Sequence, residues 1–73
     1  MQQQAQARIA GAEQVVKQIG QKKLAKDQQE TFSTIRSFLA KAKEALSLKD
    51  FPRAFILADK AKILADELLT TPP

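Results

Sequence analysis

The chain has 73 residues, of which 44% are hydrophobic and 27% charged, and its 12 basic and 8 acidic side chains give a net charge of +4. A chain of this length forms one domain and buries only about 60% of the surface that its unfolded form exposes. Because it contains no Cys and no His, the sequence excludes a disulfide framework, a zinc site with nitrogen and sulfur ligands, a thiolate nucleophile and an imidazole base.

The first predicted element is a helix over residues 3–19. Apolar residues recur there at steps of three and four, which places them on one helix face; they are Ala5, Ile9, Ala12, Val16 and Ile19. Gly20 marks the expected helix end, since glycine adopts the left-handed conformation without strain. Gly11 lies inside the helix, where it costs about 1 kcal/mol relative to alanine. It either allows another backbone to approach closely or is simply tolerated.

A lysine-rich segment follows, in which Lys17, Lys22, Lys23 and Lys26 occur with no acidic residue among them. Such a cluster could bind the phosphates of nucleic acid or of an anionic membrane. The absence of arginine and of accessible aromatic rings in this segment favours a solvated loop instead. Leu24 lies among these lysines, and we expect it to cover the end of a bundle.

The second predicted helix covers residues 28–47. Asp27 is the expected N-cap, and Glu30, three residues later, completes the pattern of a capping box. One face of this helix carries its larger apolar residues. These are Phe32, Ile35, Leu39, Ala42 and Leu46, with Phe38 and Ala45 on one flank.

The third predicted helix covers residues 51–69, with Asp50 as N-cap and Pro52 in the first turn. Its apolar stripe spans about 120° of a helical wheel and is rich in alanine. The stripe consists of Ala54, Leu57, Ala58, Ala61, Leu64, Ala65 and Leu68. Residues 70–73, Thr-Thr-Pro-Pro, end the helix and form a tail or the start of a linker.

The two connections, residues 20–26 and 47–49, are short enough to require antiparallel neighbours. The sequence therefore predicts an all-α, up-down-up antiparallel three-helix bundle that occupies residues 1–73 as one domain, interpreted as a fragment of a longer protein. Small residues on the third helix facing large ones on the second predict close packing. We accordingly expect Phe32, Phe38 and Phe51 in the core. No signal-like or membrane-spanning segment is recognised, which leaves both the cytoplasm and the bacterial envelope open.

Catalysis is not predicted. Paired carboxylates that catalyse need to converge in a cleft, whereas two of the eight acids here are expected caps and most of the others lie beside lysines. The two glycines are isolated, so there is no glycine-rich phosphate loop. We expect no cofactor, no metal and no small-molecule substrate.

A second apolar strip is predicted on the third helix, nearly opposite the first. Ile56 and Ile63 are seven residues apart, Phe55 lies at the border of the strip, and Lys60 and Glu67 lie beside it. A helix with two apolar faces indicates contact with a protein partner or with a second copy of the chain. The alternative interpretation is two isolated surface isoleucines. The favoured function is a non-catalytic interaction or structural module, and the alternative is electrostatic binding through the lysine-rich segment.

The segment Lys49-Asp50-Phe51-Pro52-Arg53-Ala54, with Ala61 seven residues later, resembles the inner turn of a tetratricopeptide-type helical hairpin. Lys49 stands where that family has glycine, the family's Trp and Tyr are absent, and a single copy offers no concave peptide-binding array. Residues 24–69 resemble helical domains of uncharacterised bacterial envelope or secreted proteins. That resemblance implies a bacterial origin and a binding or scaffold role.

Overall fold

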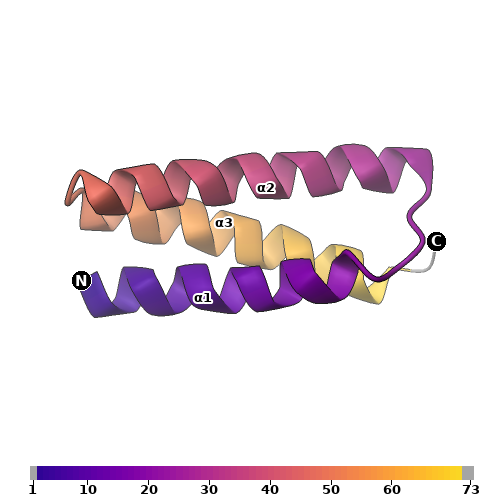
Figure 1. Ribbon diagram of the computed structural model, residues 1–73, viewed down its shortest axis with the longest axis horizontal. Helices are drawn as coiled ribbons and strands as arrows, with labels where there is room; N and C mark the ends of the chain where they lie inside the picture. Colours follow the sequence, from indigo (N-terminus) through magenta and orange to yellow (C-terminus); the bar gives the residue numbers. More distant parts are fainter. Residues whose placement is uncertain (1, 72–73) are drawn as a thin grey trace.

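The computed structural model describes residues 2–71 and contains three helices, α1 (Gln2–Ile19), α2 (Lys26–Ser47) and α3 (Phe51–Thr70). They lie along one long axis, each antiparallel to the helix before it, in a molecule of 37 × 17 × 15 Å (Figure 1). This confirms the predicted up-down-up three-helix bundle. Helix α3 extends one residue beyond its predicted end, and the last two residues of the predicted tail lie outside the described residues.

The core is built around α3, which packs against both other helices, whereas α1 and α2 make the smallest contact with each other. The inner face of α3 is made of alanines that are fully buried: Ala54, Ala58, Ala61 and Ala65. Small side chains let the neighbouring helices come close, so the larger residues of α1 and α2 fill the space between them. Ile19 and Ile35 are the largest fully buried side chains.

The bundle differs in composition between its two ends. Next to the α2–α3 connection, one alanine from each helix meets in a small cluster: Ala5, Ala45 and Ala54. At the other end, Ile19 and Leu68 belong to the main core, and Leu24 packs against it from the connecting loop. The expectation that Leu24 covers the bundle end is therefore confirmed.

Several predictions of core position need correction. Leu46, Leu57 and Leu64, predicted within the apolar stripes, are only partly buried and pack against the core from its edge. In α1 the buried residue is Val15, while Val16 is only half-buried and faces the seam with α2. The rings of Phe32, Phe38 and Phe51 are half-buried rather than enclosed. The alanine face of α3 brings the helices too close for an aromatic ring to lie between them, so Phe32 and Phe38 cover the edges of the core instead.

The start of α2 also differs from the prediction. The helix begins at Lys26, Ala25 is the N-cap, and the side-chain oxygen of Gln28 accepts a hydrogen bond from the Ala25 N–H at 2.9 Å. The expected capping box of Asp27 and Glu30 is therefore wrong. Asp27 lies inside the first turn, where its negative charge interacts favourably with the positive end of the helix dipole and so stabilises the helix.

The start of α3 is as predicted. The carboxylate of Asp50 accepts a hydrogen bond from the Arg53 N–H at 3.4 Å, and Pro52 lies in the first turn. The first turn of a helix has free backbone N–H groups, so the carboxylate satisfies one of them and proline, which has none, removes no bond.

Helix α1 ends at Ile19, as predicted, but the left-handed glycine expected after it is not present. Gly20 does not adopt the left-handed conformation; its N–H donates to the Val16 carbonyl at 2.9 Å and continues the helical pattern. Among the described non-glycine residues the left-handed one is Lys49, with a φ of 63°, just after α2. Around it the Asp50 N–H donates to the Ala45 carbonyl and the Lys49 N–H to the Leu46 carbonyl, which is a Schellman motif.

Replacing Lys49 with glycine is expected to stabilise the protein. A left-handed lysine is strained by about 1 kcal/mol and glycine is not, so Lys49→Gly should raise the free energy of unfolding by about 1 kcal/mol. For a domain of this size that corresponds to a rise in melting temperature of about 4–8 °C, measurable by circular dichroism. Lys41→Gly, the same change at an exposed position inside α2, should instead lower stability by about 1 kcal/mol. Equal effects at the two positions would contradict the presence of backbone strain at Lys49.

Candidate functional site

The outer strip, which we define as Ile56, Lys60, Ile63 and Glu67, lies on the side of α3 that faces away from the core. Ile56 is 53% exposed and Ile63 is 51% exposed. Lys60 and Glu67 are exposed beside them. The exposure expected from the helical wheel is confirmed, and two large aliphatic side chains one heptad apart remain uncovered in this molecule.

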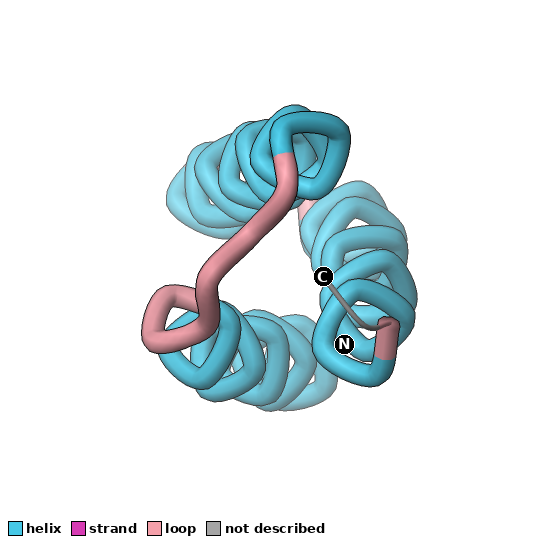
Figure 2. Tube along the Cα trace, turned by 90° about the vertical axis from the view of Figure 1, so that its right-hand side faces the viewer, coloured by secondary structure: helices cyan, strands magenta, loops and turns pink. Residues whose placement is uncertain are grey.

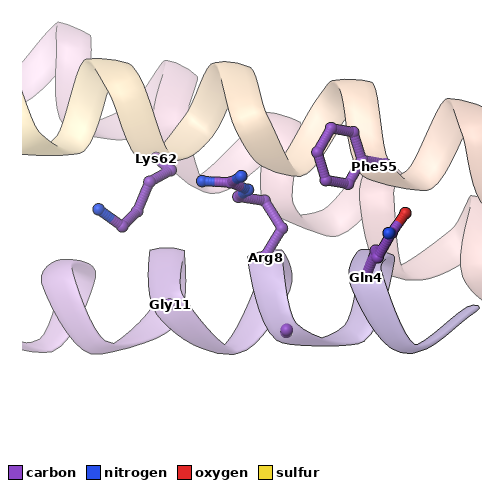
Figure 3. A pocket seen from close by; sticks show the side chains of 6 residues that line it. Gln4, Arg8, Gly11, Phe55 and Lys62 are labelled. Atoms are coloured by element: carbon purple, nitrogen blue, oxygen red, sulfur yellow. The ribbon is translucent and has the colours of Figure 1, made fainter. Parts of the chain in front are cut away.

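Phe55, expected at the border of this strip, lies toward α1 instead (Figure 3). The guanidinium carbon of Arg8 is 5.1 Å from the centre of its ring, and the Arg8 Nε is 3.5 Å from a carboxylate oxygen of Asp59. Phe55 is thus half-buried beneath the Arg8 guanidinium, which also pairs with Asp59 of α3, the helix that carries Phe55. Its place in the structure is the junction of α1 and α3, next to the outer strip.

A groove of about 480 Å³ runs along that junction, lined by Gln4, Ala7, Arg8, Gly11, Phe55 and Lys62. Its two cations already have partners, since Arg8 pairs with Asp59 and the Lys62 ammonium lies 2.7 Å from the Asp66 carboxylate. The Arg8–Asp59 pair therefore joins α1 to α3, the Lys62–Asp66 pair lies within α3, and neither cation of the groove is left unmatched for a ligand. Of the two interpretations of Gly11, the close backbone approach is wrong, because the Lys62 side chain lies there (Figure 3).

Gly11→Ala is expected to stabilise the protein. A methyl group at this position would lie 3.6 Å from the Lys62 Cε, an ordinary contact with the end of a flexible side chain. Alanine in the interior of a helix is about 1 kcal/mol more favourable than glycine, so the free energy of unfolding should rise by about that amount. Urea denaturation followed by circular dichroism measures the change. Lys62→Ala in the Gly11→Ala background should leave the gain unchanged, whereas a net loss of stability in Gly11→Ala would show that the seam needs the open space.

The four lysines of the lysine-rich segment differ in their surroundings, since one of them binds the end of α3 and three are exposed. The Lys22 ammonium donates hydrogen bonds to the backbone carbonyls of Leu69 at 2.6 Å and Thr71 at 3.4 Å. It therefore caps the C-terminal end of α3, where free carbonyls and the helix dipole favour a cation. Lys17, Lys23 and Lys26 remain exposed. The cluster expected from the sequence thus loses one of its four members to a structural contact.

A further groove, of about 320 Å³, lies between α1 and α2, and sequence reasoning did not identify it. Its lining residues are Glu13, Val16 and Lys17 from α1 and Arg36, Leu39, Ala40 and Lys43 from α2. The Lys43 ammonium lies 2.7 Å from the Glu13 carboxylate. The apolar periodicity placed Val16 within the α1 stripe, so nothing in the sequence marked it as a residue that would face α2.

Comparisons with protein-family models, with curated proteins and with solved structures gave no significant match. Within residues 2–71, no group of three or more His, Cys, Asp and Glu side chains is placed to hold a metal ion. Over the same residues, none of the helices combines the length and the apolar character needed to cross a membrane. The candidate sites are consequently the outer strip and the groove between α1 and α2.

Proposed function

We propose that this chain is a non-catalytic helical module that binds another protein surface through the outer strip of α3. The observation that supports the proposal is the pair Ile56 and Ile63, each about half exposed on a helix whose opposite face already forms the core. Leaving two aliphatic side chains in water is unfavourable by roughly 25 cal/mol for every Å² of exposed apolar surface. A partner that covers the strip recovers that free energy, and Lys60 and Glu67 beside it provide charges that fix the register.

A second copy of the chain is the partner that can be tested directly. Stable interfaces bury at least about 1,000 Å² in total, and two half-exposed isoleucines per copy contribute only part of that area. We therefore expect self-association to be weak, with a Kd of about 0.1 mM or more. Light scattering and sedimentation over concentrations from about 20 μM to about 1 mM would detect it.

Two double variants distinguish loss of the apolar contact at the outer strip from the effect of adding two negative charges anywhere on the surface. Ile56→Asp/Ile63→Asp should abolish self-association and leave the helical circular dichroism intact, because both side chains face outward. Ser33→Asp/Ser37→Asp adds the same two charges at exposed positions of α2 and should leave association unchanged. Loss of helicity in the isoleucine variant would show that these residues are needed for the fold. Equal loss of association in both variants would show that the strip is not the contact.

The competing hypothesis is electrostatic binding of nucleic acid or an anionic membrane through Lys17, Lys22, Lys23 and Lys26. Counterion release makes such binding fall steeply between low and moderate salt, whereas an apolar contact changes little. Binding to duplex DNA or anionic vesicles that persists in Ile56→Asp/Ile63→Asp but disappears when the exposed lysines are neutralised would favour this hypothesis over ours. Lys22 is the least available of the four, since its ammonium binds the end of α3.

A further inference from the structure

We propose that the groove between α1 and α2 binds an acidic amphipathic helix of a partner protein, which would lie along the bundle as a fourth helix. This site is separate from the outer strip, because its lining residues come from α1 and α2 and none comes from α3. The two proposals consequently depend on different residues and can fail independently.

The packing of the bundle leaves room for a helix at this position. Both α1 and α2 pack closely on α3 and touch each other least, so the seam between α1 and α2 is the least tightly packed of the three helix pairs. Figure 2 views the bundle from the end at which residues 20–25 cross from α1 to α2. In a four-helix bundle, a further helix packs against two neighbouring antiparallel helices. The floor of the groove is apolar, formed by Val16, Leu39 and Ala40.

The charges around the groove define the partner. Lys17, Arg36 and Lys43 line it together with one acid, Glu13, so the lining residues carry a net charge of +2. Glu13 is already paired with Lys43. Within residues 2–71, neither Lys17 nor Arg36 has a carboxylate within ion-pair distance. The Arg36 guanidinium carbon is 6.0 Å from the Phe32 ring centre, a stacking contact that leaves its N–H donors available.

An acidic helix matches both features of the groove. Its apolar residues at steps of three and four would cover Val16 and Ala40, and glutamates on its flanks would reach Lys17 and Arg36. Nucleic acid matches less well, because it has nothing to place on an apolar floor and no aromatic side chain lines the groove for base stacking. A second copy using the same groove is disfavoured, because the two linings, each with a net charge of +2, would face each other.

The probe is a synthetic, fluorescently labelled peptide of about 18 residues, or five helical turns, with leucine and alanine on one face and glutamate on the other. We expect it to bind with a Kd in the micromolar range. A matched peptide with lysine in place of each glutamate should bind at least about tenfold more weakly. Fluorescence anisotropy measures both affinities. Equal binding of the two peptides would overturn the proposal.

Variants locate the binding. Lys17→Glu/Arg36→Glu should weaken the glutamate peptide by about tenfold or more, through repulsion in place of attraction. Ala40→Glu should do the same, since Ala40 is exposed in the groove and glutamate is compatible with a helix. The matched control is Lys23→Glu/Lys41→Glu, which changes the net charge equally at exposed positions outside the groove and should cost less than about threefold. An equal loss in the control would show a non-specific charge effect and overturn the proposal.

The position of the peptide can also be mapped by amide chemical shifts. We expect the largest changes at Val16, Leu39 and Ala40. Changes concentrated at Ile56 and Ile63 would place the peptide on the outer strip, which would overturn the groove and support the first proposal. Duplex DNA or anionic vesicles that bind as tightly as the peptide, with no response to Ala40→Glu, would identify a polyanion surface and would likewise overturn it.

Discussion

Ile35→Ala should lower the free energy of unfolding by about 2–5 kcal/mol. Ile35 is one of the two largest fully buried side chains, and its removal leaves a cavity in the main core beside the middle of α2. Total stabilities of small domains start near 5 kcal/mol, so at the upper end of this range about half of the molecules would be unfolded. Urea denaturation followed by circular dichroism measures the loss, and Ile35→Val, with an expected loss of about 0.5–1.5 kcal/mol, keeps the effect measurable.

The chain provides a matched control for this prediction. Ile63→Ala removes the same atoms from a residue that is 51% exposed in the outer strip, and it should change stability by no more than about 0.5 kcal/mol. A large difference between Ile35→Ala and Ile63→Ala is the expected result. Similar losses at both positions would mean that Ile63 also contributes to the core and that the assignment of the outer strip is wrong.

Ala61→Leu should also be strongly destabilising, for the opposite reason. Ala61 is fully buried on the face of α3 against which the other helices pack, and a leucine there adds volume where no space exists. Overpacking of this kind costs about 1–3 kcal/mol and forces helices apart. Thermal denaturation should show a large fall in melting temperature.

The control is Ala10→Leu, which makes the same change at an exposed position of α1 and should alter stability by at most about 0.5 kcal/mol. An Ala61→Leu variant as stable as Ala10→Leu would mean that α3 is packed loosely. The close packing of the neighbouring helices would then not require alanine on its inner face. In that case close helix packing would no longer explain why Phe32 and Phe38 lie at the edge of the core.

Most of the fold could be predicted because it depends on patterns local to the chain. The four alanines and Leu68 of the predicted α3 stripe are buried, whereas its Leu57 and Leu64 are only partly buried; in α2 the predicted Ile35, Leu39 and Ala42 are buried. The short connections then allowed only an antiparallel arrangement. The exposure of Ile56 followed from the same wheel, since a residue opposite a buried stripe must face outward.

The remaining features depend on how the helices meet, which no single segment encodes. Val15 and Val16 are adjacent, and which of them is buried depends on the direction of α3 as seen from α1. Lys22 caps a helix 47 residues further along the chain, so the contact exists only once the bundle has formed. Gln28 replaced the expected Asp27 and Glu30 because the helix began two residues earlier than its capping signal indicated.

The candidate sites follow the same division. The outer strip belongs to one helix and was visible as a spacing of seven, whereas the groove between α1 and α2 combines residues more than 20 positions apart, such as Val16 and Leu39. Finding that groove requires knowing which pair of helices is in least contact. The apolar stripe of each segment, considered alone, does not indicate which two helices make the smallest contact.

The central position of α3 has a consequence for how the chain folds. Helices α2 and α3 are joined by a three-residue connection and form an extensive contact, so they make a hairpin of segments that are close in the chain. We expect this hairpin to assemble first and α1 to dock afterward onto the exposed flank of α3. The contacts between α1 and α3, which α2 separates in the chain, then form last, and a helical bundle of this kind is expected to fold in microseconds to milliseconds.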